Sequence, residues 1–330
     1  MSEPRAQRRV APTQPPRLGA LRVTTVAAPG FSPDEAFIVF AHAILRREAA
    51  ALAANQPQPE RAPTPDEIHG LRVAARRLRV ALRLFGRMLP RKEAARFGAE
   101  LRWFARSLGD VRDLDVYSES FDAYVQALTA EKRRGLSGYR LYLRRERTEA
   151  RQRAAAACSR PRTAALLAGL ERFVGKDPTP AALRRWGSLT VRDAVRQGMR
   201  RGVGRVRRLG NPLMERARAT QLHDLRIKTK RLRYELEFFA EVYPALKPTA
   251  RECKALQELL GAHQDVYTAT ARLRRYAALL RKQGADATLP PALVELRRSQ
   301  LALAREVRRS FRTKWPAFVA MIGAARQLVA

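Results

Sequence analysis

Cysteine is almost absent from the sequence, and its two residues, Cys158 and Cys253, lie far apart. Two isolated cysteines exclude a disulfide framework and a zinc site built on paired cysteines. No segment approaches the roughly 18 consecutive apolar residues of a membrane-spanning helix, and the N-terminus lacks the apolar stretch of a secretory signal. We therefore expect a protein without a membrane span in a reducing compartment, the cytoplasm.

Signatures of catalysis are also missing. There is no Gly-Lys-Ser/Thr phosphate loop and no Gly-x-Ser-x-Gly nucleophile motif. Asp110, Asp113 and Asp115 suggest a Mg²⁺ site, but we favour a structural role in which Asp113 caps a helix or pairs with Arg77. The sequence thus predicts a protein that is not an enzyme and holds no metal or cofactor.

Acidic residues are too few to balance the basic ones. Lys and Arg together number 65 against 31 Asp and Glu, which gives a formal net charge of +34. Such an excess destabilises the compact state by self-repulsion and attracts polyanions, such as nucleic acid, an anionic membrane surface or an inorganic phosphate polymer. Arginine outnumbers lysine, which favours forked contacts to phosphate oxygens.

The pattern of the chain from residue 31 onward is helical, with no alternating β pattern. Ser32-Pro33-x-Glu35 and Thr64-Pro65-x-Glu67 have the form of capping boxes with proline at the first helical position. The predicted helices cover residues 33–55, 65–88, 91–108, 113–129, 131–157, 161–175, 181–208, 213–241, 248–261, 264–283, 291–311 and 314–328.

Three parts of the chain are distinguished by composition. Residues 1–30 are rich in proline and arginine and predict a flexible basic tail. The stretch 174–182 is the best boundary between two halves, 31–176 and 177–330. We expect an all-α fold of two tandem four-helix-type bundles, related by a pseudo-twofold axis, around a central basic cavity or pore.

An internal repeat supports this division. The segment IHGLRVAARRLRVALRLF (68–85) aligns without a gap with LHDLRIKTKRLRYELEFF (222–239). A second pair of segments follows about 30 residues later, where LRWFARSLGDVRDLDV (101–116) aligns with CKALQELLGAHQDVYT (253–268). Leu108-Gly109 then matches Leu260-Gly261, and Asp113 matches Asp265. The same order at similar separation indicates a duplication.

The first repeated segment carries a basic stripe on a helix. At about 100° per residue, its histidine and four of its arginines fall within a sector about 80° wide, beside an apolar face. The second copy has the same stripe, except that Glu237 replaces the last arginine. Each like-charge pair at this spacing costs ~0.2–0.5 kcal/mol in an isolated helix, and solvated faces usually mix signs. A stripe of one sign, present twice, therefore predicts two basic helices that face a shared polyanion site.

The stripes and two matched basic residues one helix later make up the predicted anion site: His69, Arg72, Arg76, Arg79, Arg83, Arg102, His223, Arg226, Lys230, Arg233 and Lys254. Secondary candidates at i, i+4 and i+7 on another helix are Arg201, Arg205 and Arg208. Surface charge without a ligand is the alternative interpretation of these last three.

The duplicated motifs resemble the CHAD family, the conserved histidine α-helical domain. The family's pattern is His-x-x-Arg-[Val/Ile]-x-x-[Arg/Lys]-[Arg/Lys]-Leu-Arg followed by Leu-Gly-x-x-x-Asp, each twice, and the likeness spans about residues 31–328. The resemblance implies two helical bundles around a basic cavity that binds inorganic polyphosphate, with an association with polyphosphate granules. Glu237 departs from a fully basic stripe. A nucleic-acid-binding module is the rival hypothesis, although aromatic residues make up only 7% of the chain and no known nucleic-acid motif is present. A phosphohydrolase is a third.

Overall fold

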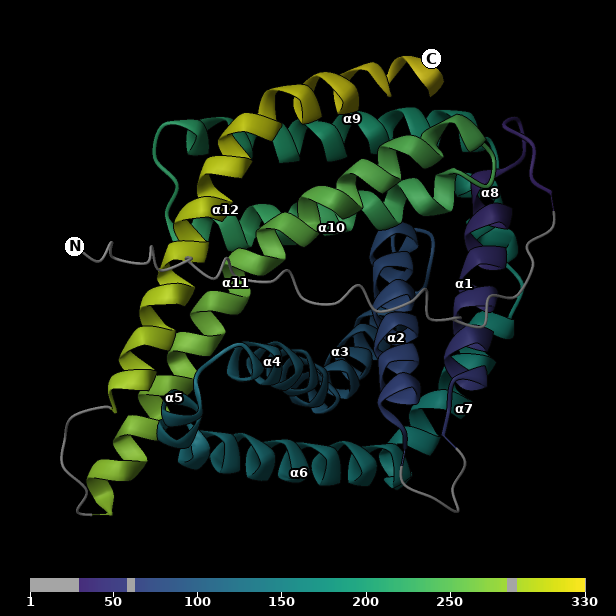
Figure 1. Ribbon diagram of the computed structural model, residues 1–330. Helices are drawn as coiled ribbons and strands as arrows, with labels where there is room; N and C mark the ends of the chain where they lie inside the picture. Colours follow the sequence, from purple (N-terminus) through teal and green to yellow (C-terminus); the bar gives the residue numbers. More distant parts are fainter. Residues whose placement is uncertain (1–29, 58–62, 284–289, 330) are drawn as a thin grey trace.

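The computed structural model describes residues 30–57, 63–283 and 290–329, and within these ranges the chain is all-α (Figure 1). An isolated antiparallel bridge joins Ala36 and Thr190. The α-helices are α1 (Phe37–Ala54), α2 (Pro65–Phe85), α3 (Arg91–Ser107), α4 (Gly109–Gln126), α5 (Ala130–Gly135), α6 (Ser137–Ser159), α7 (Pro161–Gly175), α8 (Pro180–Trp186), α9 (Val191–Gly210), α10 (Ala219–Phe239), α11 (Lys247–Lys282) and α12 (Pro291–Ala324). Short 3₁₀ turns are η1 (Asn211–Met214), η2 (Pro244–Leu246) and η3 (Gln327–Val329).

The two helices that carry the basic stripes lie side by side. Helix α2 packs against α1, α3, α4 and α10, and α10 packs against α9 and α11. The long helices α11 and α12 run together along one edge of the molecule, and α6 runs along an adjacent edge (Figure 1). The two repeated segments thus pack directly on each other, with other helices on both sides.

The main hydrophobic core extends across the predicted boundary between the halves. It joins buried residues of α1, α2 and α3 with those of α9, α10 and α11. A smaller core holds the ends of α4, α6, α11 and α12 around Phe121, Tyr139 and Leu293. The division into two tandem repeats at residue 176 remains a prediction, and the predicted tail lies outside the described residues.

One of the two predicted capping boxes is confirmed. The Thr64 hydroxyl accepts from the amide of Glu67, whose carboxylate accepts from the Thr64 amide, so α2 begins as predicted. The prediction that a helix begins after Ser32 is wrong, because α1 begins at Phe37. Ser32 instead begins a turn, in which the amide of Glu35 donates to its carbonyl at 3.2 Å, and Ala36 is extended where the amide of Phe37 donates to the carbonyl of Leu189 at 2.8 Å.

Several other predicted boundaries are also wrong. Residues 131–157 and 181–208 were each expected to form one helix, but the chain is interrupted near Leu136 and between α8 and α9. Conversely, α11 continues past Gly261 through residues 262–263, and α12 continues through residues 312–313 and Pro316, although gaps between helices were predicted at 262–263 and 312–313. Tertiary packing on both sides overrides these local helix breakers. In the described part of the chain, no helix has the length and apolar character needed to cross a membrane.

Candidate anion-binding surface

Helices α2 and α10 contact each other through residues at matched positions of the repeat. Arg77 Nη1 on α2 lies 2.9 Å from Glu237 Oε2 on α10. The reciprocal pair is Arg231 on α10 and Arg83 on α2, where burial, followed by the positive charge of Arg231, lowers the pKa of Arg83. Glu237 occupies the position that matches Arg83. The same pair of matched positions therefore meets twice where α2 and α10 cross. Arg77 and Glu237 attract each other, and Arg83 and Arg231 repel each other.

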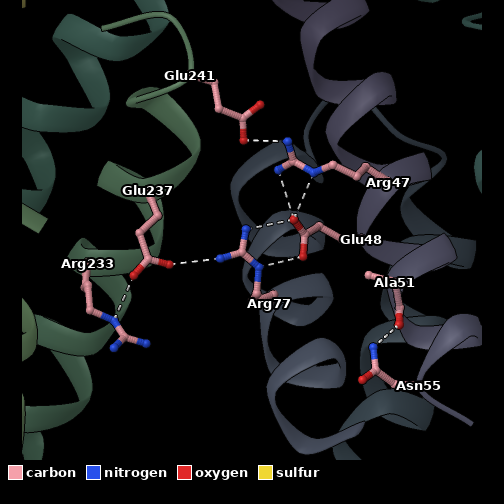
Figure 2. Close-up of polar contacts among 8 residues, drawn as sticks. All are labelled: Arg47, Glu48, Ala51, Asn55, Arg77, Arg233, Glu237 and Glu241. Atoms are coloured by element: carbon pink, nitrogen blue, oxygen red, sulfur yellow. Dashed lines mark hydrogen bonds and ion pairs between the residues drawn. The ribbon is translucent and has the colours of Figure 1, made fainter. Parts of the chain in front are cut away.

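An ion-pair network holds this crossing together (Figure 2). Glu48 of α1 is 2% exposed and accepts two hydrogen bonds from Arg77, at 2.7 and 2.9 Å. Glu237 accepts from Arg77 and also faces Arg233 Nε at 3.4 Å. Burial alone would lower the pKa of Arg77, but the carboxylates of Glu48 and Glu237 outweigh it and raise the pKa above its ordinary value. Arg77 therefore has a structural role and lies outside the stripe.

The two basic stripes face each other across this crossing. Burial, followed by the charges of Arg76, Arg226, Arg233 and Arg72, lowers the pKa of Lys230 to about 6. These neighbours come from both helices, which places the middle of the α2 stripe against the middle of the α10 stripe. At pH 7 the Lys230 amine is largely neutral in the free protein. An anion among these groups would favour its protonation.

Arg72 connects the two sequence motifs of the first copy. Its Nη1 donates to the carbonyl of Gly109 at 2.6 Å, and its Nη2 lies 3.5 Å from Asp113 Oδ1. In the second copy the guanidinium of Arg226 packs against Gly261, with Nε 3.6 Å from where a Cβ would stand. The two motifs of each copy therefore form one contact, in which the arginine of the first rests on the Leu-Gly segment of the second.

The role predicted for Asp113 is wrong. Helix α4 begins at Gly109, so Asp113 lies past its first turn and does not cap it, and its ion-pair partner is Arg72 rather than Arg77. Asp115 contacts Arg147 and Arg151, on α6, at 2.5 and 3.1 Å. The aspartates of this segment are thus directed to different arginines. Among residues 30–57, 63–283 and 290–329, no group of three or more His, Cys, Asp and Glu residues could hold a metal ion.

The histidines that begin the two stripes have different neighbours. Burial, followed by the positive charges of Arg112 and Arg72, lowers the pKa of His69. His223 Nδ1 lies 2.9 Å from Gln264 Oε1, to which it donates a hydrogen bond, and Gln264 occupies the position that matches Arg112. Arg112 is absent from the predicted set because its match in the second copy is a neutral residue. Its position could have indicated it, because Arg112 lies within the Leu-Gly-x-x-x-Asp motif, directly before Asp113.

The C-terminal half of the α2 stripe continues onto α3. Burial, followed by the charges of Arg83 and Arg102, lowers the pKa of Arg79, which is half-buried. No hydrogen bond or ion pair engages Arg76, Arg79 or Arg83 within the described residues. We call the following group the central basic surface: Arg72, Arg76, Arg79, Arg83, Arg102, Arg226, Lys230 and Arg233.

The secondary candidates on α9 adjoin the central basic surface beside α10. Arg205 Nη2 lies 3.6 Å from Glu235, and burial lowers the Arg205 pKa, opposed by Glu235 and assisted by Arg231, Arg201 and Arg208. The predicted site residue Lys254 is not brought to this cluster by any contact. Its side chain is 61% exposed and lies 3.8 Å from a glutamate one turn along α11.

Comparison with known proteins places the chain in a family. The family model described as the CHAD domain matches residues 43–274. Two Mycobacterium tuberculosis proteins, MT2285 of strain CDC 1551 / Oshkosh and Rv2226 of strain ATCC 25618 / H37Rv, are each 28% identical to the chain over 228 residues. That segment is 68% of this chain and 43% of each relative, so the chain spans less than half the length of the curated relatives it matches.

Two solved structures share the fold. The crystal structure of the CHAD domain from the plant Ricinus communis aligns with a TM-score of 0.58 at 23% identity, covering 94% of this chain and 97% of that one. PptA from Streptomyces chartreusis aligns with a TM-score of 0.63 at 18% identity, covering 86% of this chain and all of that one. Because the family model covers well over half of the sequence and includes both copies of both motifs, the chain belongs to the CHAD domain family.

Proposed function

We propose that the protein binds inorganic polyphosphate on the central basic surface without transforming it. The observation that carries this proposal is the convergence of two single-sign stripes, from α2 and α10, on Lys230. Cations at this density repel one another, and bound anions would offset the repulsion. Membership of the CHAD family adds support, since the family resemblance implies this ligand.

The chemistry of the surface suits a chain of phosphates. Polyphosphate offers closely spaced oxyanions and no bases, so a binding site needs charge and hydrogen-bond donors rather than stacking platforms. The guanidinium groups of Arg76, Arg79 and Arg83 are free of intramolecular partners in the described part of the chain and can each present a fork to phosphate oxygens. Arg72 and Arg226 rest on Gly109 and Gly261, so we assign them to holding the surface in shape as much as to direct contact.

The test uses a variant that removes charge without disturbing those structural contacts. Arg76, Arg79, Arg83 and Lys230 are changed together to Gln. The matched control changes four exposed arginines elsewhere to Gln, with a similar change in charge: Arg133, Arg144, Arg297 and Arg305.

Binding of long-chain polyphosphate is measured by fluorescence anisotropy over a range of salt concentrations. The slope of log K against log salt should shrink by about 0.7 for each phosphate that the variant no longer neutralises, by analogy with single-stranded nucleic acid. We expect this change in the site variant and little change in the control. Equal behaviour of the two variants would mean that net charge alone attracts the polymer.

Two further measurements separate the proposal from its rivals. Duplex DNA or RNA is added as competitor at equal phosphate concentration, and displacement of polyphosphate would favour the nucleic-acid hypothesis. Release of orthophosphate in the presence of Mg²⁺ would favour a phosphohydrolase. Association with polyphosphate granules in the cytoplasm is part of the proposal, and microscopy of the fluorescently tagged protein in cells with and without polyphosphate synthesis tests it.

A further inference from the structure

A basic pocket lies apart from the central basic surface. It has a volume of about 530 Å³ and lies between α9 and the C-terminal end of α12. Its lining consists of Arg196, Arg200, Gly323, Arg326 and Gln327, three arginines and no carboxylate. The proposed function does not use any of these residues.

One arginine of this pocket is held in place. Arg196 Nε donates to the carbonyl of Val329 at 2.8 Å, which ties η3 to α9 and leaves the two terminal nitrogens of the guanidinium unengaged within the described residues. Arg200 follows one turn later on α9, so the two like charges stand at i and i+4, an unfavourable spacing unless an anion lies between them. Arg326 lines the same pocket from the turn after α12.

Gly323 of α12 forms part of the pocket wall with its backbone alone. Apart from the adjacent backbone of α12 itself, no atom of the described residues lies within 4 Å of where a Cβ would stand at Gly323. The carbonyls at this end of α12 would repel an anion if they were free, but Met321 and Gly323 accept hydrogen bonds from the amides of Ala325 and Arg326. The lining therefore presents guanidinium donors, and these two carbonyls do not oppose them.

The position of the pocket separates it from the central basic surface. Arg205 on α9 reaches Glu235 of α10. Arg196 is nine residues earlier, about two and a half helical turns, and so lies on the opposite side of α9. Of the acidic residues near this end of α9, Asp34 pairs with Arg192 at 2.8 Å, and Asp193 accepts a hydrogen bond from the Thr190 hydroxyl at 3.0 Å. An anion in the pocket would thus bind independently of one on α2 and α10.

We propose that this pocket is a second anion site, which takes a small, multiply charged phosphate compound. Three guanidinium groups approaching from α9 and from the end of α12 match a tetrahedral oxyanion better than a carboxylate, which has only two oxygens to share. Pyrophosphate is the probe, because it supplies two phosphate groups and no other recognition feature.

The variants distinguish the loss of specific pocket residues from a general loss of positive charge. Arg200→Gln with Arg326→Gln removes two exposed cations that make no side-chain hydrogen bond or ion pair in the described chain. Gly323→Leu adds a side chain over the pocket wall and leaves the charge unchanged. Arg133→Gln with Arg144→Gln removes the same charge far from the pocket, on α5 and α6.

Pyrophosphate binding is followed by calorimetry and by the backbone amide NMR signals of Gly323 and Arg326. We expect these two amides to shift on titration, and the affinity to fall at least about 10-fold in both pocket variants. The control should retain the wild-type affinity. The four-residue variant of the central basic surface should also retain it, because that result distinguishes this site from the proposed polyphosphate site. Unchanged signals at the two amides, or an equal fall in affinity in the pocket and control variants, would overturn the proposal.

Discussion

Lys230 makes a quantitative prediction about how pH controls polyphosphate binding. Burial and four surrounding arginines lower its pKa to about 6 in the free protein. Bound phosphate replaces repulsion with attraction, so the pKa must rise in the complex. Between the two pKa values the complex carries more protons than the free protein. Affinity is therefore highest below pH 6 and falls as pH rises through that window.

The magnitude follows from the same linkage. If one proton is taken up on binding, log K falls by one unit per pH unit, about 1.4 kcal/mol for each. We expect a slope approaching −1 between pH 7 and pH 9. Burial also lowers the pKa of His69 in the free protein, so comparison with Lys230→Gln isolates the part of the slope that belongs to Lys230. Long chains are used so that titration of terminal phosphates adds little.

The assay is the affinity for long-chain polyphosphate at constant ionic strength from pH 7 to pH 9. Calorimetry in buffers of different ionisation enthalpy counts the protons taken up. Lys230→Gln should flatten the profile and bind more weakly than the wild type, by a margin that narrows as the pH rises, and Lys230→Arg should flatten it at high affinity, because a guanidinium stays charged. Lys228→Gln is the control, since Lys228 lies on the other side of α10. A flat wild-type profile, or the same slope in wild type and Lys230→Gln, would refute the reasoning.

Three predictions concern the stability and reactivity of the fold. Glu48→Gln should lower the free energy of unfolding by about 3–5 kcal/mol in urea denaturation, because Arg77 is then left without its buried carboxylate. Thr64→Ala should cost about 1 kcal/mol in the same assay, since the start of α2 is no longer capped. Burial raises the pKa of Cys158 to about 11 and that of Cys253 to about 12, so the buried Cys253 should not react with a maleimide at pH 7.5 until the protein is unfolded, and the partly exposed Cys158 should react slowly.

Each of these changes has a matched control in the chain. Glu306→Gln removes a carboxylate from an exposed pair with Arg309 and should change stability by less than about 0.5 kcal/mol. Thr129→Ala alters the N-cap of α5, where the threonine makes no capping hydrogen bond, and should have little effect. Destabilisation by these controls as large as that at Glu48 and Thr64 would contradict the roles assigned to the two residues. Maleimide labelling of Cys253 in the native protein would contradict its burial.

Local sequence patterns predicted the elements on which the site is built. The capping box at Thr64 and the helical period of 68–85 predicted helix α2 and its start correctly, because both depend on residues within a few positions of each other. The matched positions of Arg72 and Arg226, and of Gly109 and Gly261, indicated that the two motifs belong together. The family resemblance then pointed to the same surface.

Contacts between segments that lie far apart in the sequence could not be predicted from such local patterns. Residues 33–36 have a good helix start by composition, but residues 33–35 form a turn and Ala36 pairs with Thr190 in an antiparallel bridge, so the helix starts later. Arg77 lies in the same helix as the stripe residues, and only the buried Glu48 of another helix shows that its role is structural. Lys254 matched Arg102 in sequence, but their surroundings differ, because the charge of Arg102 acts on Arg79, whereas Lys254 is exposed beside a glutamate of its own helix.

Glu237 occupies the position in α10 that matches Arg83 in α2, and this difference affects how the two helices pack against each other. A perfect copy would set arginine against arginine at both ends of the α2–α10 crossing, so the halves would push each other apart. The glutamate at position 237 replaces one of these two repulsive contacts with an ion pair to Arg77. The other contact, between Arg83 and Arg231, stays positively charged. A difference at a single matched position thus allows two basic helices, α2 and α10, to pack against each other while both stay basic.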